Sequence, residues 1–113
     1  MGDHHEQRNH YRIHYPAGAK PLLETEGLQL RVTELSEGGV RVLELSSDLA
    51  AGASVAGTLA LCNGERHDVT SVVGRREGEE TVLIQLAGVS FGAVMREQQH
   101  LVTHFPSYRT DKG

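Results

Sequence analysis

Apolar and polar residues alternate along two neighbouring stretches of the chain, 28–36 (LQLRVTELS) and 40–45 (VRVLEL). Leucine or valine occupies every second position at the start of each stretch, which is the pattern of a strand with one face toward a core. The glycine-rich connection at 37–39 (EGG) predicts a hairpin or tight turn, because glycine tolerates a positive φ.

The same pattern continues toward the C-terminus. Residues 54–76 predict two strands joined at the Asn-Gly dipeptide of 63–64, a strong hairpin signal. A turn at 77–80 and a last strand, or pair of short strands, over 81–91 follow. Cys62 falls inside a predicted strand, where free cysteine usually acts as a small hydrophobic residue. Six or seven short strands with regular turns favour a small closed or nearly closed barrel.

The period then becomes helical. Over residues 92–105 the apolar side chains fall along one stripe, made of Val94, Met95, Leu101, Val102 and Phe105. Arg96, Glu97 and Gln99 are predicted to face away from this stripe, and Pro106 ends the helix. We expect one amphipathic helix that lies across the barrel.

Composition adds limits to this picture. A chain of 113 residues fits one domain. With no tryptophan and few other aromatic residues, its core must rest on valine, leucine, alanine and isoleucine. Residues 1–10 contain one apolar side chain, Met1. We therefore expect a flexible N-terminal arm over 1–14, a barrel with its helix over 15–106 and a tail over 107–113.

Charge and cysteine usage narrow the function classes. The formal net charge of −4 argues against a DNA or RNA partner, since duplex binding normally needs a broad basic surface. The single cysteine excludes an internal disulfide and fits a reducing compartment. No apolar run resembles a signal peptide or a membrane span, so we expect a cytoplasmic protein.

Catalytic and metal-binding patterns are weak. Ser36 lacks the Gly-x-Ser-x-Gly context of a nucleophile, and no phosphate-binding glycine loop is present. His10 and His14 have a spacing that suits a metal only on a helix, and they lack an acidic or thiolate partner at a convincing spacing. We expect neither an enzyme nor a metal protein.

Two short motifs carry more information. Arg8 and Arg12 stand four positions apart in the N-terminal arm, and guanidinium groups suit phosphate oxygens or the Hoogsteen edge of guanine. In 34–39 (ELSEGG), Glu34 and Ser36 are two apart, so both point the same way from an extended chain. The residues alone leave two readings open: a receptor for a guanine nucleotide, or a surface arginine pair near an ordinary turn.

Read in order, these motifs resemble a known family. RNHYR (8–12) matches the R-x-x-x-R motif of PilZ domains, and ELSEGG matches their [D/N]-x-S-x-x-G motif at Ser36 and Gly39. The interval between the motifs, the β-rich middle, GVSF (88–91) and the terminal helix are also similar. The resemblance covers roughly residues 7–105, and we expect no attached output domain.

The resemblance implies a fold and a ligand. PilZ domains are bacterial cyclic di-GMP receptors built on a six-stranded antiparallel barrel with a C-terminal helix. By that resemblance, Arg8 and Arg12 would bind the phosphates and stack on or hydrogen-bond the guanines. The remaining implied ligand-binding residues are Gln7, Glu34, Ser36, Gly38 and Gly39. No cofactor is expected beyond this ligand, and a protein effector is the implied partner.

Glu34 is the departure from the family pattern, since it stands where the motif has Asp or Asn. Its acceptor oxygens are displaced by about one carbon–carbon bond. Two functions therefore follow: an adaptor whose N-terminal arm orders on ligand binding, or a degenerate PilZ-like interaction module that binds no nucleotide. Arg75 and Arg76 are predicted to lie beside the site.

Overall fold

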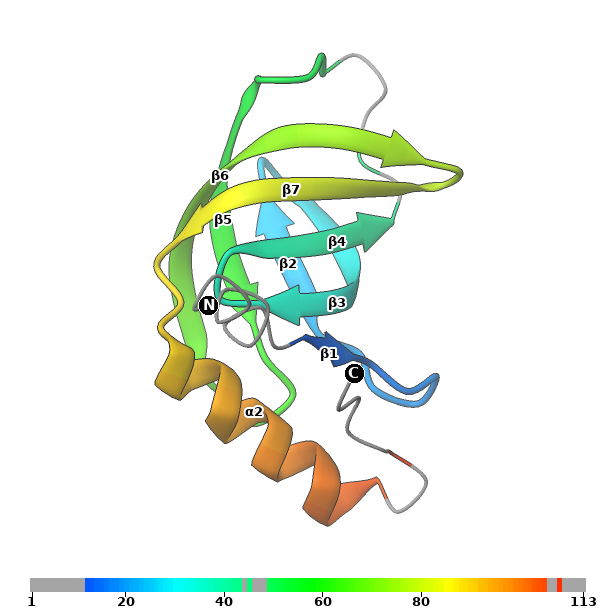
Figure 1. Cartoon of the computed structure of the whole chain (residues 1–113), viewed down its shortest axis with the longest axis vertical. Helices are drawn as coiled ribbons and strands as arrows, with labels where there is room; N and C mark the ends of the chain where they lie inside the picture. Colours follow the sequence, from blue (N-terminus) through cyan, green and yellow to red (C-terminus); the bar gives the residue numbers. More distant parts are fainter. Residues whose placement is uncertain (1–11, 44, 46–48, 106–107, 109–113) are drawn as a thin grey trace, which may run out of the picture.

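The computed structural model describes residues 12–43, 45, 49–105 and 108. Within them, the chain forms seven strands and one helix (Figure 1). Their bounds are β1 Ile13–His14, β2 Leu22–Thr25, β3 Leu28–Ser36, β4 Gly39–Leu43, β5 Ser54–Ala60, β6 Arg66–Glu77, β7 Glu80–Ala87 and α2 Phe91–His104.

Six of these strands close into an antiparallel barrel. The order is β3-β2-β5-β6-β7-β4, and the pairing of β4 with β3 closes the ring. The two-residue strand β1 pairs with the end of β3, where Ile13 lies opposite Leu35. Because β4 occupies the other edge of β3, β1 lies on the same edge as β2. The predicted six-stranded barrel with a terminal helix is confirmed.

The core inside the barrel is aliphatic, as composition predicted. Its buried hydrophobic residues among those described are isoleucine, valine, leucine and alanine, with Leu35, Leu59 and Leu83 completely buried. Tyr15 and Phe105 pack against this core while remaining partly exposed. Each fully buried leucine or valine contributes about 1.5–3 kcal/mol relative to exposure, so the core rests on many moderate contributions.

Two local predictions were wrong. Cys62 lies in the turn between β5 and β6, because that connection spans residues 61–65 and not the Asn-Gly pair alone. Residues 88–91 do not extend the last strand. The chain passes β6 so closely at Gly88 that a Cβ there would lie 2.2 Å from the Asp68 carbonyl oxygen. Ser90 then caps α2, its side chain accepting a hydrogen bond from the Ala93 amide at 3.1 Å.

Helix α2 lies across one end of the barrel, beside β1 and the β5–β6 turn (Figure 1). Its buried residues are Ala93, Val94, Glu97 and Leu101. Met95 and Val102, predicted to belong to the core-facing stripe, are 36% and 48% exposed. Glu97, predicted to face away, is fully buried. The buried face is therefore rotated around the helix from the apolar stripe.

Glu97 is buried because donors surround its carboxylate. Oε2 accepts hydrogen bonds from the Tyr15 hydroxyl and the Cys62 amide, both at 2.8 Å, and Oε1 accepts one from the Asn63 amide at 3.0 Å. We call these four residues the Glu97 clasp. Burial, and then the nearby carboxylate, raises the pKa of the Tyr15 hydroxyl. The same two causes raise the pKa of the Cys62 thiol to about 11. The clasp joins α2 to the β5–β6 turn and to the segment after β1.

Two residues of the N-terminal arm predicted over 1–14, Ile13 and His14, form strand β1. Ile13 is fully buried and His14 pairs with Glu34 in β1, so both belong to the sheet. Residues 1–11, with Gln7 and Arg8, lie outside the described residues.

The described part of the chain contains no helix of the length and apolar character that a membrane span requires.

Candidate functional site: a groove on the outer face of the barrel

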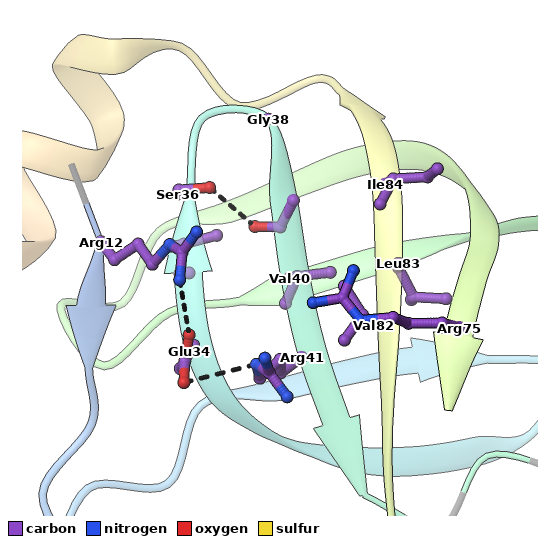
Figure 2. Close-up of a pocket in the computed structure, with 12 residues that line it drawn as sticks. Arg12, Glu34, Ser36, Gly38, Val40, Arg41, Arg75, Val82, Leu83 and Ile84 are labelled. Carbon is purple, nitrogen blue, oxygen red and sulfur yellow. Dashed lines mark hydrogen bonds and ion pairs between the residues drawn. The ribbon is translucent and has the colours of Figure 1, made fainter. Parts of the chain in front are cut away.

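A groove of about 270 Å³ lies on the outer face of the barrel over β3, β4 and β7 (Figure 2). We call it the arginine groove, because Arg12, Arg41 and Arg75 reach into it from three different strands or strand ends. Its other lining residues are Glu34, Leu35, Ser36, Gly38, Gly39, Val40, Val82, Leu83 and Ile84.

A β-bulge in β3 places the motif side chains on this outer face. Val32 pairs with Val42, but the next pair is Glu34 with Arg41, so Thr33 is an extra residue on β3. Without that shift, Glu34 would follow the inward phase of Val32. The bulge reverses the phase, so that Leu35 enters the core and Glu34 faces outward with Ser36.

Two glycines follow the bulge at the β3–β4 hairpin, and one of them lets two strands lie close together beneath the groove. The predicted hairpin is present, with a two-residue turn at 37–38 between Ser36 and Gly39. Neither Gly38 nor Gly39 has a positive φ, so the physical reason given from the sequence was wrong. Space is the reason at Gly39, since a Cβ there would lie 2.9 Å from the Leu83 carbonyl oxygen on β7. A residue with a side chain would push β4 and β7 apart beneath the groove.

Glu34 stands at the centre of the polar contacts. Its Oε2 lies 3.4 Å from Arg41 Nε and 3.3 Å from His14 Nδ1, while Oε1 lies 4.0 Å from Arg12 Nη1. Arg12 is thus held loosely, and its side chain is 54% exposed. Among the described residues, Oε2 therefore has two close partners, whereas Oε1 has one cation at 4.0 Å.

Arg41 and Arg75 are linked through Glu77. Arg41 Nη1 donates to Glu77 Oε1 at 2.7 Å and to Glu80 Oε1 at 3.2 Å, and Arg75 Nε donates to Glu77 Oε2. Arg75 and Arg41 together lower the pKa of Glu77, and the bond to Glu77 raises the pKa of Arg41. Arg41 is only 18% exposed, so it forms the fixed part of the groove.

The structure brings most of the sequence-predicted site together. Arg12 and the second-motif residues Glu34, Ser36, Gly38 and Gly39 line one groove, although the two motifs are distant in sequence. Gln7 and Arg8 lie outside the described residues.

Of the two arginines predicted beside the site, Arg75 lines the groove and Arg76 does not. Arg76 donates to the carbonyl oxygens of Leu45 and Leu49 and to Thr81 Oγ1, so it braces the end of the barrel. Sequence reasoning missed Arg41 and the aliphatic wall of β7. The polar position of Arg41 between two core valines was the available signal. No cluster of three or more potential metal ligands occurs within the described residues.

Comparison with known proteins gives two matches. The family model described as PilZ domain matches residues 6–105. The solved structure of Bacillus subtilis inhibitor of motility (MotI/DgrA) superposes with a TM-score of 0.58 and 17% sequence identity, over 90% of this chain and 53% of that one. The chain thus spans about half the length of MotI/DgrA, and the likeness concerns the fold. No curated protein sequence matches significantly. The family match covers nearly the whole chain, including both motifs, and the chain belongs to the PilZ domain family.

Proposed function

We propose that this protein is a cyclic di-GMP receptor that acts as an adaptor, passing a ligand-dependent change of its surface to a protein effector. The observation that carries the proposal is the convergence of Arg12, Glu34, Ser36 and Gly39 in the arginine groove. These are the residues that the two family motifs assign to ligand binding. Membership in the PilZ family supports the same ligand.

The chemistry of the groove suits the parts of a cyclic dinucleotide. Arg12 is exposed and loosely paired, so its guanidinium can turn toward a phosphate. Glu34 Oε1 can accept from the N1–H and N2–H₂ groups of guanine. Among the described residues, Ser36 Oγ has one long contact to give up, at 3.4 Å from the Gly39 carbonyl oxygen.

Arg8 is proposed to complete the site. Strand β1 fixes Arg12 at the edge of the groove, because Ile13 is buried beside it. Four extended residues span at most roughly 14 Å, so the Arg8 Cα stays within that distance of the Arg12 Cα. Ordering the N-terminal arm costs roughly 1–2 kcal/mol per residue, and each charge-assisted hydrogen bond contributes about 1.5–3 kcal/mol, so several bonds from Arg8 and Arg12 together are needed to offset the cost. We therefore propose that the N-terminal arm orders over the groove when the ligand binds.

The arrangement of charges favours a second candidate. Every arginine in the groove has a carboxylate partner among the described residues, with Glu34 standing where the family has a shorter Asp or Asn. A groove that satisfies its own cations binds anions less well. The alternative is a PilZ-like interaction module that binds no nucleotide.

Isothermal titration calorimetry with cyclic di-GMP tests the first proposal. Wild type is compared with Arg8→Ala, Arg12→Ala and the control Arg66→Ala, which removes an arginine from outside the groove. We expect Arg8→Ala and Arg12→Ala to weaken binding by roughly tenfold or more, because each loses a charge-assisted bond. Arg66→Ala should bind as wild type does. Equal affinities in all four proteins would refute the assigned role of the arginine pair.

Backbone amide shifts during the titration separate the two candidates. Changes clustered at residues 7–14 and 34–39 support the receptor and the ordering of the N-terminal arm. A wild-type spectrum that cyclic di-GMP leaves unchanged, up to millimolar concentration, favours the interaction module.

A further inference from the structure

Arg75 enters the arginine groove from the side opposite Arg12. Figure 2 shows Arg12 reaching in from beside β3 and Arg75 reaching across β7 from β6. Arg75 belongs to neither PilZ motif. We propose that Arg75 is a further ligand-binding residue, which contacts the second phosphate of the bound cyclic dinucleotide. This inference rests on the proposed function and adds a binding residue to it.

A second β-bulge is what turns Arg75 outward. Val73 pairs with Leu83, and the next pair is Arg75 with Val82, so Gly74 is an extra residue on β6. Val69, Ser71 and Val73 are buried at every second position, and Arg75 would follow their inward phase without the shift. The groove thus receives Glu34 and Arg75 through the same device, on two strands. Bulges commonly re-aim side chains at functional sites.

Arg75 also has the most exposed side chain of the three arginines in the groove. Its side chain is 60% exposed, and its only described partner is Glu77, which accepts from Nε. The two terminal nitrogens have no partner within the described residues. Arg41, by contrast, is mostly buried and contacts three carboxylates. Arg12 and Arg75 are therefore the two exposed guanidinium groups, one on each side of a fixed centre.

This pairing fits the ligand's charge. Cyclic di-GMP carries two phosphates on opposite sides of one ring, and Arg12 supplies a cation from the β1 side. Arg75 supplies a cation from the β6 side, with its terminal nitrogens free to donate to phosphate oxygens. The phosphate contact does not need the bond from Nε to Glu77, because the two terminal nitrogens make it.

The test compares Arg75→Gln with Arg66→Gln by calorimetry with cyclic di-GMP. Arg66 is the matched control: it lies on the same strand, is 57% exposed and pairs with one carboxylate, Glu24, but it does not line the groove. We expect Arg75→Gln to raise Kd by roughly tenfold to a hundredfold and Arg66→Gln by less than about twofold. Arg75→Lys, which keeps the charge without the fork of donors, should fall between. Equal Kd values for the two glutamine variants would overturn the proposal.

Glu77→Gln separates contact from positioning. If Arg75 contacts the ligand, weakening its carboxylate partner leaves affinity unchanged or raises it. If Arg75 acts only by holding Glu77 and Arg41 in place, Glu77→Gln weakens binding as Arg75→Gln does, and the proposal fails. Wild-type protein that binds no cyclic di-GMP overturns both this inference and the proposed function. Wild-type binding that Arg75→Gln leaves intact overturns the inference alone.

Discussion

Glu34 and Glu97 are the same chemical group in two opposite settings. Glu97 sits at the closed end of the barrel, fully buried, and accepts three hydrogen bonds of 2.8–3.0 Å, two of them from backbone amides. Glu34 sits on the outer face, partly exposed, and its contacts to Arg12, His14 and Arg41 are 3.3–4.0 Å long.

The difference separates a structural role from a binding role. The partners of Glu97 are fixed by the fold, and removing the carboxylate strands buried donors that water reaches poorly. Two partners of Glu34, Arg12 and His14, are about half exposed to water and to a ligand, and Arg41 has two further carboxylate partners, so the contacts of Glu34 exchange at little cost. A carboxylate that holds the fold together is surrounded by backbone donors, whereas one that serves a ligand keeps replaceable partners.

The largest effect is expected from Glu97→Ala. The variant leaves the partly buried Cys62 and Asn63 amides and the Tyr15 hydroxyl without their acceptor, at about 1–3 kcal/mol for each group that water does not reach. We expect the free energy of unfolding in urea to fall by about 3 kcal/mol or more. Gln99→Ala, at an exposed position of the same helix, controls for helix propensity and should change stability by less than about 0.5 kcal/mol.

Tyr15→Phe measures how much of this loss of unfolding free energy comes from the Tyr15 hydroxyl. It removes one donor and leaves both amides bonded to Glu97, so it should cost less than Glu97→Ala. The comparison between the two carboxylates fails if Glu97→Ala is no more destabilising than Gln99→Ala.

The barrel could be predicted because apolar and polar residues alternate within its individual strands. Val40 and Val42 point into the core as the pattern required, and the predicted hairpin is present at 37–38. The second family motif falls on the β3–β4 hairpin, where its residues line the arginine groove. The alternation of apolar and polar residues and the position of a turn depend on residues that are adjacent in the chain, so both can be predicted from one sequence.

What the sequence left hidden depends on contacts between distant strands. The bulges at Thr33 and Gly74 reverse the alternation, and only the paired strand defines them. Likewise, nothing local marks Glu97 as buried, because its donors come from Tyr15 and from the turn at Cys62. The helical period favoured an apolar stripe through Met95 and Val102, and a polar contact decided the actual buried face.

A smaller, pH-dependent effect is expected from the exposed contact beside the Glu97 clasp. Arg96 Nε donates to Glu65 Oε2 at 2.7 Å, and the His67 ring lies 2.9 Å from Oε1. The bond from Arg96, and then His67, lowers the pKa of Glu65 to about 2. Because this is below the value of about 4.5 in the unfolded chain, the contribution is complete above pH 4.5 and is lost as pH falls toward 2.

Urea unfolding of wild type and Arg96→Gln between pH 7 and pH 3 measures this contribution. We expect a small stability gap at pH 7, because Arg96 and Glu65 are open to solvent, and a narrower gap below pH 4.5. A gap that stays constant through this range would show that Arg96 acts by packing and not through Glu65.

The smallest effect on stability is expected from Glu34→Ala, although it removes the central carboxylate of the groove. Arg41 keeps Glu77 at 2.7 Å and Glu80 at 3.2 Å, and Arg12 is already exposed, so no buried cation is stranded. The free energy of unfolding should change by less than about 1 kcal/mol.

The affinity of Glu34→Ala for cyclic di-GMP should nevertheless fall, since the proposed guanine acceptor is gone. Glu34→Asp, which restores the family's shorter carboxylate, should bind at least as tightly as wild type. A loss of stability comparable to that of Glu97→Ala would mean that the groove is a structural element whose carboxylate is no freer than the buried one.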